Sequence, residues 1–260
     1  MHALSPAERG RYDADGFLVR RGVLRAAEVA ALRDAAERTA MAAAALAARG
    51  RSYHLDGNRF ADVDGVTVQF EHGADSGTVR VVEPAHVFDP RWDALLDDDR
   101  LVAPMRALVG CDRVALWTDK LNLKRPRAGS GFRWHQDSPY WIHDCGHVDR
   151  LPNVMVILDD ATAANGCLRI IRGSHRRGRL PGTDDGTQLG GFFTDPGSFD
   201  EADQVAIEAP AGSLVFFSPH AVHGSLPNRS RKPRRAWIAT YQPGDQRMLK
   251  LPRTRNCPNA

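Results

Sequence analysis

Three side chains in this sequence have the types and the spacing of a metal site. His135 and Asp137 lie two positions apart in the run GSGFRWHQDSPYW, residues 129–141. On an extended strand, residues i and i+2 point to the same face, so one strand can offer an imidazole and a carboxylate to one cation. His223, far downstream, can supply a second imidazole from a neighbouring strand. Two imidazoles and one carboxylate on one face of an octahedral ion are a ligand set for non-haem Fe(II).

The His-x-Asp triplet is weak evidence when it stands alone, because a surface histidine near an aspartate is its commoner meaning. The motifs that follow it make the pattern more specific. They are Leu158-Asp159-Asp160, Asn165-Gly166-Cys167, Gly173-Ser174-His175, His223-Gly224-Ser225 and Lys232-Pro233-Arg234-Arg235. This ordered set, over residues 114–241, resembles the phytanoyl-CoA dioxygenase family of Fe(II)- and 2-oxoglutarate-dependent oxygenases. The resemblance implies Fe(II), 2-oxoglutarate as cosubstrate, and O2.

His220 competes with His223 for the distal ligand position. The two residues are three positions apart, so on a strand their imidazoles face opposite ways and only one can point inward. The resemblance selects His223, because the family places its distal histidine directly before Gly-Ser. It therefore implies His135, Asp137 and His223 as the catalytic iron ligands. Related iron halogenases have a small residue in place of the carboxylate, so Asp137 implies hydroxylation or another oxidation.

A 2-oxoglutarate cosubstrate needs a cation for its far carboxylate. Arginine suits this role because its guanidinium donates two parallel hydrogen bonds and keeps its charge. The resemblance places this arginine eleven residues after the distal histidine, at Arg234; Arg235 would face the other way on a strand, and either could instead be a solvated charge. By the same resemblance Lys120, Asn122 and Met155 are cofactor-binding candidates, although a core role for Met155 is at least as well supported.

Aromatic residues in and around the His-x-Asp run are candidates for substrate binding. We expect substrate contacts from Phe132, Trp134, Tyr140 and Trp141, with Trp117, Phe192 and Phe193 as further wall residues of an apolar pocket. The simpler alternative is that these rings belong to the core. Residues 178–204, rich in Gly, Asp and Thr, form a long connection that is typical of a lid.

The order of the elements predicts how these residues are positioned. A short helix should begin at Ser5-Pro6, followed by a strand at 17–19, a long helix over 25–48, a loop region over 50–78, a strand at 80–83 and one or two helices over 90–109. From 114 to 242, strand-like runs alternate with Gly and Pro. We therefore expect a mainly β fold with flanking α-helices. A helix-rich part, 1–110, packs on a double-stranded β-helix (jelly roll, cupin-like) core, 111–245, within one domain, 1–260.

Composition favours a folded cytoplasmic protein. The chain has 260 residues, is 42% hydrophobic and 26% charged, and carries a formal charge of +3. This charge is too small for a nucleic-acid-binding protein, and no apolar run approaches the roughly 20 residues of a membrane span. The four cysteines have no metal-site or disulfide spacing, and no secretory signal is visible at the start. We expect a cytoplasmic monomer or homodimer with a small-molecule substrate.

The sequence thus predicts an Fe(II)- and 2-oxoglutarate-dependent oxygenase that hydroxylates a small molecule and forms succinate. High Ala and Arg content is typical of a GC-rich bacterial source, which favours a role in specialised-metabolite biosynthesis. The alternative from another class is a cupin-like protein that binds a metal or small molecule without redox turnover. A zinc site at His143, Cys145 and His147 is disfavoured, because no complementary ligand pair follows.

Overall fold

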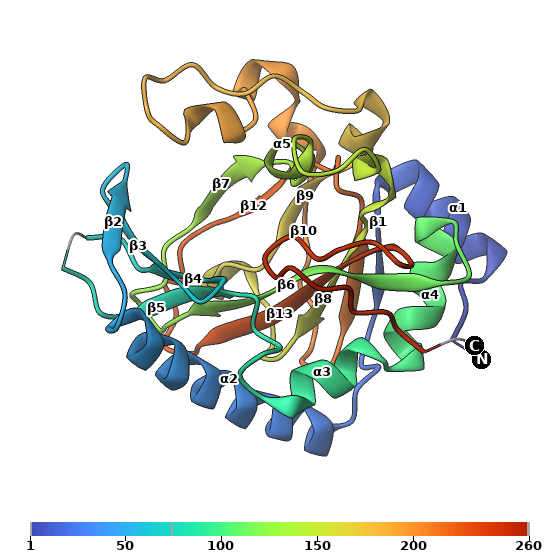
Figure 1. The fold of residues 1–260 in the computed structure, drawn as a ribbon. Helices are drawn as coiled ribbons and strands as arrows, with labels where there is room; N and C mark the ends of the chain where they lie inside the picture. Colours follow the sequence, from blue (N-terminus) through green and yellow to red (C-terminus); the bar gives the residue numbers. More distant parts are fainter. Residues whose placement is uncertain (1, 74, 259–260) are drawn as a thin grey trace.

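Two antiparallel β-sheets face each other in the computed structural model, which describes residues 2–73 and 75–258 (Figure 1). The larger sheet has the order β1-β11-β8-β13-β6-β5-β4-β3-β2, and the smaller has the order β10-β9-β12-β7. The strands are β1 (Phe17–Arg20), β2 (Ser52–Leu55), β3 (Asn58–Val63), β4 (Val66–Phe70), β5 (Val79–Glu83), β6 (Val114–Lys124), β7 (Phe132–His135), β8 (Asn153–Ile157), β9 (Arg169–Ile171), β10 (Gln204–Ala206), β11 (Leu214–Phe217), β12 (His223–Ser225) and β13 (Arg234–Pro243). The predicted jelly roll with flanking helices is confirmed.

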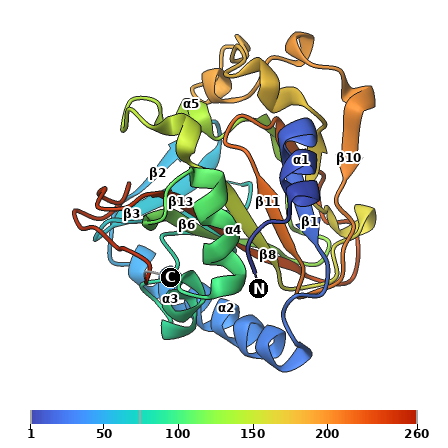
Figure 2. The same cartoon turned by 90° about the vertical axis from the view of Figure 1, so that its right-hand side faces the viewer.

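Helices cover the outside of the larger sheet (Figure 2). Those on this face are α2 (Ala26–Ala47), α3 (Pro90–Leu96) and α4 (Asp99–Val109), whereas α1 (Pro6–Asp15) packs beside β1 and α5 (Ser138–Trp141) follows β7. Short 3-10 helices lie at Val148–Arg150, Ala163–Asn165, Ser174–Arg177, Gly190–Phe192, Pro196–Ser198 and Glu201–Asp203. A capping box fixes the start of α1, where Ser5 N–H donates to Glu8 Oε2 (2.9 Å) and Glu8 N–H donates to Ser5 Oγ (3.3 Å). The alanine-rich composition of α2 suits a long helix.

The main core lies between these helices and the outer face of the larger sheet. Trp92 of α3 stacks on Trp237 of β13, with ring centroids 5.7 Å apart, and both side chains are fully buried. Their indole N–H groups are paired, Trp92 with Thr39 Oγ1 at 2.9 Å and Trp237 with Asp119 Oδ2 at 2.8 Å. A second core fills one end of the space between the sheets, with Phe217 among its buried residues. The other end of that space holds a cavity.

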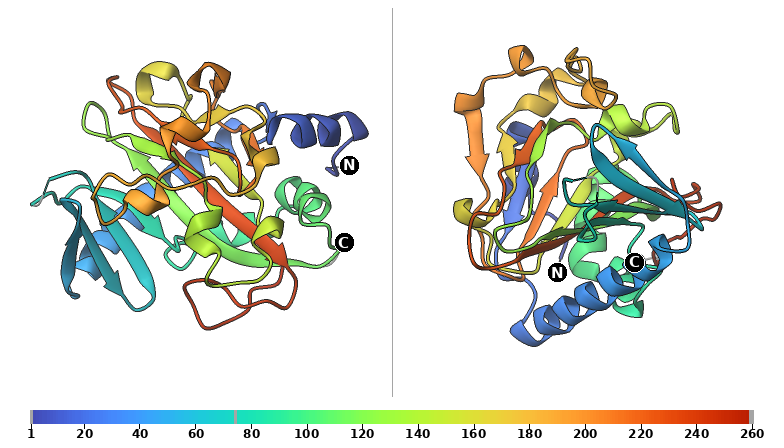
Figure 3. Two further views of the ribbon diagram at one scale, coloured as in Figure 1. Left: turned by 90° about the horizontal axis from the view of Figure 1, so that it is seen from above. Right: turned by 90° about the vertical axis from the view of Figure 1, so that its left-hand side faces the viewer.

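The N-terminal part departs from its prediction. Residues 50–78, expected as a loop region, instead contain β2, β3 and β4, which extend the larger sheet as an antiparallel meander. Figure 3 shows these strands at the end of the molecule opposite the two chain termini. Residues 1–110 are therefore not merely helix-rich, since they contribute five strands, β1 to β5, to the same sheet as the C-terminal strands.

The long connection between β9 and β10 lies over the smaller sheet (Figure 1). It is tied to β7, because Thr194 N–H donates to the Trp134 carbonyl oxygen at 2.9 Å and Phe193 forms an isolated bridge with His135. The four cysteines are free thiols. In the described part of the chain, every helix is too short or too polar to cross a lipid bilayer.

Candidate metal centre and active site

His135, Asp137 and His223 come together at the open end of the space between the sheets. Each offers one ligand atom, and the three atoms lie within 4.8 Å of one another. His135 ends β7, His223 begins β12, and the two are direct cross-strand partners with ring centroids 4.1 Å apart. Asp137 Oδ2 lies 3.9 Å from His223 Nε2. Across residues 2–73 and 75–258, this is the one group of three His, Cys, Asp or Glu side chains placed to hold an ion.

Asp137 is not on the strand, contrary to the prediction that it shares one with His135. β7 ends at His135, and the Asp137 backbone has helical angles, φ −78° and ψ −30°, just before α5. The backbone N–H groups of Asp137 and Ser138 both donate to the Pro219 carbonyl oxygen, each at 3.0 Å. This turn, rather than strand alternation, brings the carboxylate beside the two histidines.

Hydrogen bonds orient all three candidate ligands. His135 Nδ1–H donates to the Arg133 carbonyl oxygen at 2.7 Å, and His223 Nδ1–H donates to the Ala221 carbonyl oxygen at 3.0 Å. A carbonyl can only accept, so Nδ1 of each ring carries a proton and Nε2 is the nitrogen left for a metal. Asn153 Nδ2 donates to Asp137 Oδ2 at 2.9 Å, which fixes the carboxylate. Such outer partners orient metal ligands and fix their tautomer.

The electrostatics favour the protonation states that bind a metal. Burial lowers the pKa of His135 to about 3, with the neighbouring His223 adding to the effect, so its imidazole is neutral. Burial opposes ionisation of Asp137, but His223, Lys120, His135 and the Asn153 hydrogen bond outweigh it and hold its pKa below the usual range. A neutral imidazole and an ionised carboxylate are the forms that coordinate Fe(II).

His220 lies outside this cluster. It belongs to the turn before β12 rather than to the strand, and its Nε2 is 2.7 Å from Asp149 Oδ1. Gln136 fastens that turn, since its buried side-chain amide donates to the His220 carbonyl oxygen at 2.6 Å. The geometry therefore leaves His223 as the distal candidate.

A cavity of about 520 Å³ opens beside the three side chains. A volume of this size suits a small molecule. The cavity extends along β6 and β13 and is walled on one side by β2 to β5. Among its lining residues are Leu55, Asp56, Phe60, Arg80, Glu83, Lys120, Asn122, Phe132, Tyr140, Met155, Phe193, Ser225 and Arg234.

Arg234 presents an unpaired donor in this cavity. Its side chain is 3% exposed, and its Nε and Nη2 donate to the Gly166 carbonyl oxygen at 3.1 and 2.7 Å. Its Nη1 is buried without a hydrogen-bond partner. A buried guanidinium with a free N–H fits the carboxylate of a keto acid. Arg235 faces the other way and is paired with Asp159 and Glu37, as strand alternation predicts.

A comparison with protein families shows which family the chain belongs to. The model of the family described as phytanoyl-CoA dioxygenase (PhyH) matches residues 12–236. The chain belongs to the phytanoyl-CoA dioxygenase family. The match covers both the helical N-terminal part and the strands that hold the candidate ligands.

Relatives of the protein within this family are oxygenases of small molecules. It is 31% identical over 264 residues to ectoine dioxygenase of Bordetella parapertussis, covering 92% of this chain and 75% of the relative. It is 28% identical over 183 residues to L-proline trans-4-hydroxylase of Streptomyces griseoviridis, covering 64% and 68%. The solved structure of EctD from S. alaskensis with 2-oxoglutarate and 5-hydroxyectoine is 27% identical, covers 99% of this chain and 86% of that one, and has a TM-score of 0.73.

This phytanoyl-CoA dioxygenase family member is an Fe(II)- and 2-oxoglutarate-dependent oxygenase that uses O2. Its donor set fits both groups. Two imidazoles and a carboxylate match the preference of Fe(II), and the unpaired Nη1 of Arg234 fits the far carboxylate of 2-oxoglutarate.

The other cofactor-binding candidates of the oxygenase line the same cavity. Lys120 and Asn122 alternate along β6 with buried leucines. Met155 of β8 lies on the other side of β13, where Ile238 is the cross-strand partner of both Lys120 and Met155. Burial opposes the charge of Lys120, yet the nearby carboxylates of Glu83 and Asp137 raise its pKa.

The predicted aromatic wall is correct only in part. Phe132, Tyr140 and Phe193 line the cavity, and Phe192 stacks on Tyr140 with centroids 4.7 Å apart. Trp141 does not line it, because it packs against Trp117 and Leu151 in a separate core.

Trp134 is also misplaced by the prediction. It precedes His135 on β7 and so points to the opposite face of that strand, where it packs against Phe199 with ring centroids 5.8 Å apart. The expected places of Trp134 and Trp141 in the pocket wall were therefore wrong.

Sequence reasoning missed several residues of this site. Asn153, Ser225, Glu83 and Arg80 were not singled out, although the first two had a signal. Asn153 lies at i−2 from Met155 and so shares its strand face, and Ser225 lies at i+2 from His223. No such signal marks Glu83 and Arg80 in the sequence, because their position beside the cavity depends on how β5 pairs with β6.

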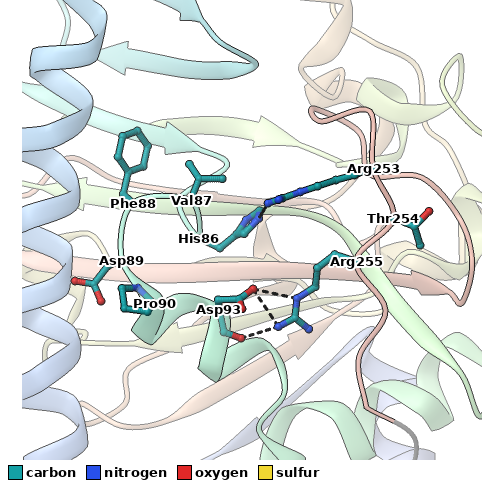
Figure 4. A pocket seen from close by; sticks show the side chains of 9 residues that line it. All are labelled: His86, Val87, Phe88, Asp89, Pro90, Asp93, Arg253, Thr254 and Arg255. Atoms are coloured by element: carbon teal, nitrogen blue, oxygen red, sulfur yellow. Dashed lines mark hydrogen bonds and ion pairs between the residues drawn. The ribbon is translucent and has the colours of Figure 1, made fainter.

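A second cavity, of about 620 Å³, lies where the C-terminal tail meets the segment before α3 (Figure 4). His86 is among its lining residues, with Nδ1 2.6 Å from the buried Asp119 and Nε2 3.0 Å from Arg253. Arg255 is paired with Asp93 at 3.1 Å. These contacts hold the tail against the barrel, on the far side of β6 from the candidate ligands.

The zinc alternative finds no support in the described residues. His143, Cys145 and His147 do not form a metal-binding group there. The ring of His147 packs edge-on against Trp117, and its Nε2 is 3.1 Å from Gln242 Oε1.

Proposed function

We propose that His135, Asp137 and His223 hold Fe(II), that Arg234 holds the far carboxylate of 2-oxoglutarate, and that the enzyme hydroxylates a small polar metabolite. One observation carries the assignment. A cluster of two histidines and one carboxylate shares one cavity of about 520 Å³ with a buried arginine that has an unpaired Nη1. When bound, iron and 2-oxoglutarate supply the oxidation, in which O2 converts a substrate C–H to C–OH while 2-oxoglutarate becomes succinate and CO2.

The residues of the chain bind and orient the reactants. Arg234 fixes one end of 2-oxoglutarate, so that the keto-acid end reaches the three ligands. Asn153 keeps the Asp137 carboxylate in position. Phe132, Tyr140 and Phe193, together with the connection over residues 178–204, exclude water from the cavity.

A pair of opposite charges points to the substrate class. Val81 of β5 pairs with Asn122 of β6, and continuing this antiparallel register places Glu83 opposite Lys120. Both side chains line the cavity without forming an ion pair with each other within 4 Å in the described structure, and Glu83 Oε1 accepts from Thr118 Oγ1 at 2.8 Å. A substrate that carries both an anionic and a cationic group would satisfy them together. The proline and ectoine substrates named for the relatives are consistent with such a molecule.

The setting of the enzyme is part of the same proposal. Residues 1–260 act as one catalytic domain, a cytoplasmic monomer or homodimer that serves specialised-metabolite biosynthesis and binds no nucleic acid. The shared nine-stranded sheet supports the single domain, and the formal charge of only +3 supports the absence of nucleic-acid binding.

The test begins with an anaerobic titration of the apo-protein with Fe(II) and 2-oxoglutarate, following the visible charge-transfer absorption. O2 and a succinate assay follow, with L-proline, its methyl ester and N-acetyl-L-proline as probes of similar shape that differ in charge. We expect the band, and stimulation of succinate formation by the zwitterion above that by either analogue. Folded, metal-loaded protein without the band would overturn the assignment, and stimulation by the singly charged analogues alone would overturn the substrate class.

A further inference from the structure

Two buried basic side chains lie side by side next to the candidate 2-oxoglutarate site. Lys124 of β6 and Arg234 of β13 are direct cross-strand partners and are 1% and 3% exposed. Neither takes part in an ion pair within 4 Å with a carboxylate of the described residues. Burying two like charges side by side without a counter-charge is costly, so this pair disfavours a charge on both groups until an anion enters.

The hydrogen bonds of Lys124 suit a neutral amine. Its Nζ donates to Ser225 Oγ at 2.7 Å and to the Leu226 carbonyl oxygen. An ammonium has three N–H donors, whereas a neutral amine has two, which equals the number of acceptors that the described structure provides. The third proton of an ammonium has no acceptor in the described structure.

The surroundings of Lys124 disfavour its charge at neutral pH. Burial, followed by the proximity of Arg234 and Arg80, lowers its pKa to about 6, and only Glu71 and Cys167 act in the other direction. Glu71 is itself engaged, accepting from Ser130 N–H at 3.0 Å. The other oxygen of Glu71, Oε1, is buried without a hydrogen-bond partner, so Glu71 is a carboxylate already near Lys124, and the incoming carboxylate of 2-oxoglutarate would add a second negative charge.

Ser225 connects Lys124 to the cavity. Ser225 lines the cavity, whereas Lys124 lies behind it. A hydroxyl that accepts from Lys124 keeps its own O–H free to donate in another direction. The arrangement is closely fitted, because a Cβ on Gly166 would come within 2.8 Å of Lys124 Nζ, and the Gly166 carbonyl holds Arg234.

We propose, on the basis of the proposed function, that Lys124 is a positioning residue for 2-oxoglutarate. By donating to Ser225 Oγ it directs the Ser225 hydroxyl proton toward the far carboxylate, which then receives donors from both Ser225 and Arg234. Lys124 takes up one proton as the carboxylate binds. Cosubstrate binding is thus coupled to protonation of a buried lysine that does not touch the cosubstrate.

Proton uptake can be counted without turnover. The Fe(II)-loaded enzyme is titrated anaerobically with 2-oxoglutarate in a calorimeter, in phosphate and in Tris, whose ionisation enthalpies differ. We expect the uptake per 2-oxoglutarate to approach one proton at pH 7.5 and to fall toward zero near pH 5, where Lys124 is already charged. Lys124→Met should abolish this uptake and weaken 2-oxoglutarate about tenfold at pH 7.5.

Two further variants separate the role of Lys124 from a packing effect. Lys124→Gln can still donate one hydrogen bond to Ser225, so it should restore part of the affinity without restoring proton uptake. Lys232→Met removes an exposed lysine just before β13 and should behave like the wild type. If Lys124→Met fails to fold, the wild-type proton count and Lys124→Gln still decide.

The outcomes distinguish the two proposals. Binding of 2-oxoglutarate by the wild type with no proton uptake, or with equal uptake in Lys124→Gln, would overturn the role of Lys124 and leave the proposed function intact. Failure of the metal-loaded wild type to bind 2-oxoglutarate would overturn the proposed function itself.

Discussion

At the scale of single residues, His220 and His223 differ in what surrounds the Nε2 atom of the imidazole. His223 faces His135 and Asp137, whereas His220 Nε2 is engaged by Asp149 at 2.7 Å. We expect His223→Ala to weaken Fe(II) by more than about 100-fold, since loss of an outer-shell partner alone costs 10- to 100-fold. His220→Ala should bind Fe(II) nearly as the wild type does. Competition with a chromogenic Fe(II) chelator measures both, and similar losses in the two variants would contradict the assignment.

Arg234 and Arg235 are adjacent in sequence and opposite in role. Arg234 holds an unpaired N–H in the cavity, while Arg235 is committed to Asp159 and Glu37. Arg234→Leu should weaken 2-oxoglutarate by about ten- to 100-fold, because hydrogen bonds to charged groups are worth about 1.5–3 kcal/mol. Arg235→Leu should leave that affinity nearly unchanged and lower the melting temperature instead. Calorimetric titration and thermal unfolding of both variants provide the check, and the reverse pattern would show that the strand register misassigns them.

The limits of sequence reasoning are visible at the same scale. The three candidate ligands and Arg234 could be found because they stand in motifs with fixed spacing. Asp137 reached its place through a turn held by the Pro219 carbonyl, which no pattern of alternation describes. The prediction for Trp134 was wrong for the opposite reason. Strand alternation from His135 already indicates that Trp134 points to the other face of β7, away from the cavity.

At the scale of elements, the hairpins β2–β3 and β3–β4 carried a signal that was overlooked. Their turns are Asp56-Gly57 and Asp64-Gly65, and all four residues have positive φ, from 50° to 78°. Asp-Gly between short strands is a strong indication of a two-residue hairpin. The strands themselves were hard to recognise because β2 is largely exposed and polar, so its side chains lack the apolar alternation of a buried strand.

The β2–β3 turn also holds the long connection over the cavity. Asp56 accepts from the backbone N–H groups of Gln188 and Leu189, both at 2.8 Å, and Asp56 and Leu189 line the cavity. Asp56→Asn keeps a residue that tolerates positive φ but removes the charge and one acceptor. We expect hydrogen exchange of these two amides to speed up about tenfold or more, with a higher KM for substrate.

The matched control for the contact of Asp56 with residues 188 and 189 is Asp64→Asn, which makes the same change in the next hairpin turn, where φ is 53°. It should leave the exchange of residues 188 and 189 unchanged. Equal acceleration in both variants would mean that the hairpins as a whole, and not the Asp56 contact, restrain the connection.

At the scale of the whole molecule, the segments that frame the site come from both ends of the chain. β1 pairs with β11, so residues near the N-terminus complete the sheet beside the strand that precedes His223. The C-terminal tail crosses the other end, where Leu116 N–H donates to the Arg255 carbonyl oxygen at 2.8 Å. These contacts of the two chain ends could not be predicted from local patterns, because they join residues about 140 to 200 positions apart.

The ion pair between α1 and β1 near the N-terminus should make folding stability sensitive to acid. Glu8 caps α1 and binds Arg20 of β1 at 2.9 Å, and the Arg20 hydrogen bond is the main reason that the pKa of Glu8 falls to about 2 from an ordinary value of 4.5. A carboxylate whose pKa is lower in the folded state stabilises the protein above its unfolded pKa, and this contribution is lost as pH falls through the folded value. The window is therefore about pH 4.5 to 2.

Replacing Glu8 tests this coupling between one ion pair and the whole fold. Glu8→Gln should lower the free energy of unfolding at pH 7 by about 1–2 kcal/mol, after allowance for solvent screening of a partly exposed pair. The deficit relative to the wild type should shrink through the window and vanish near pH 2, because both proteins then carry a neutral side chain. Urea unfolding at pH 7, 4, 3 and 2 measures the difference, in which carboxylates common to both proteins cancel. Glu201→Gln, an exposed site, is the control, and a deficit independent of pH would assign the effect of Glu8 to packing rather than charge.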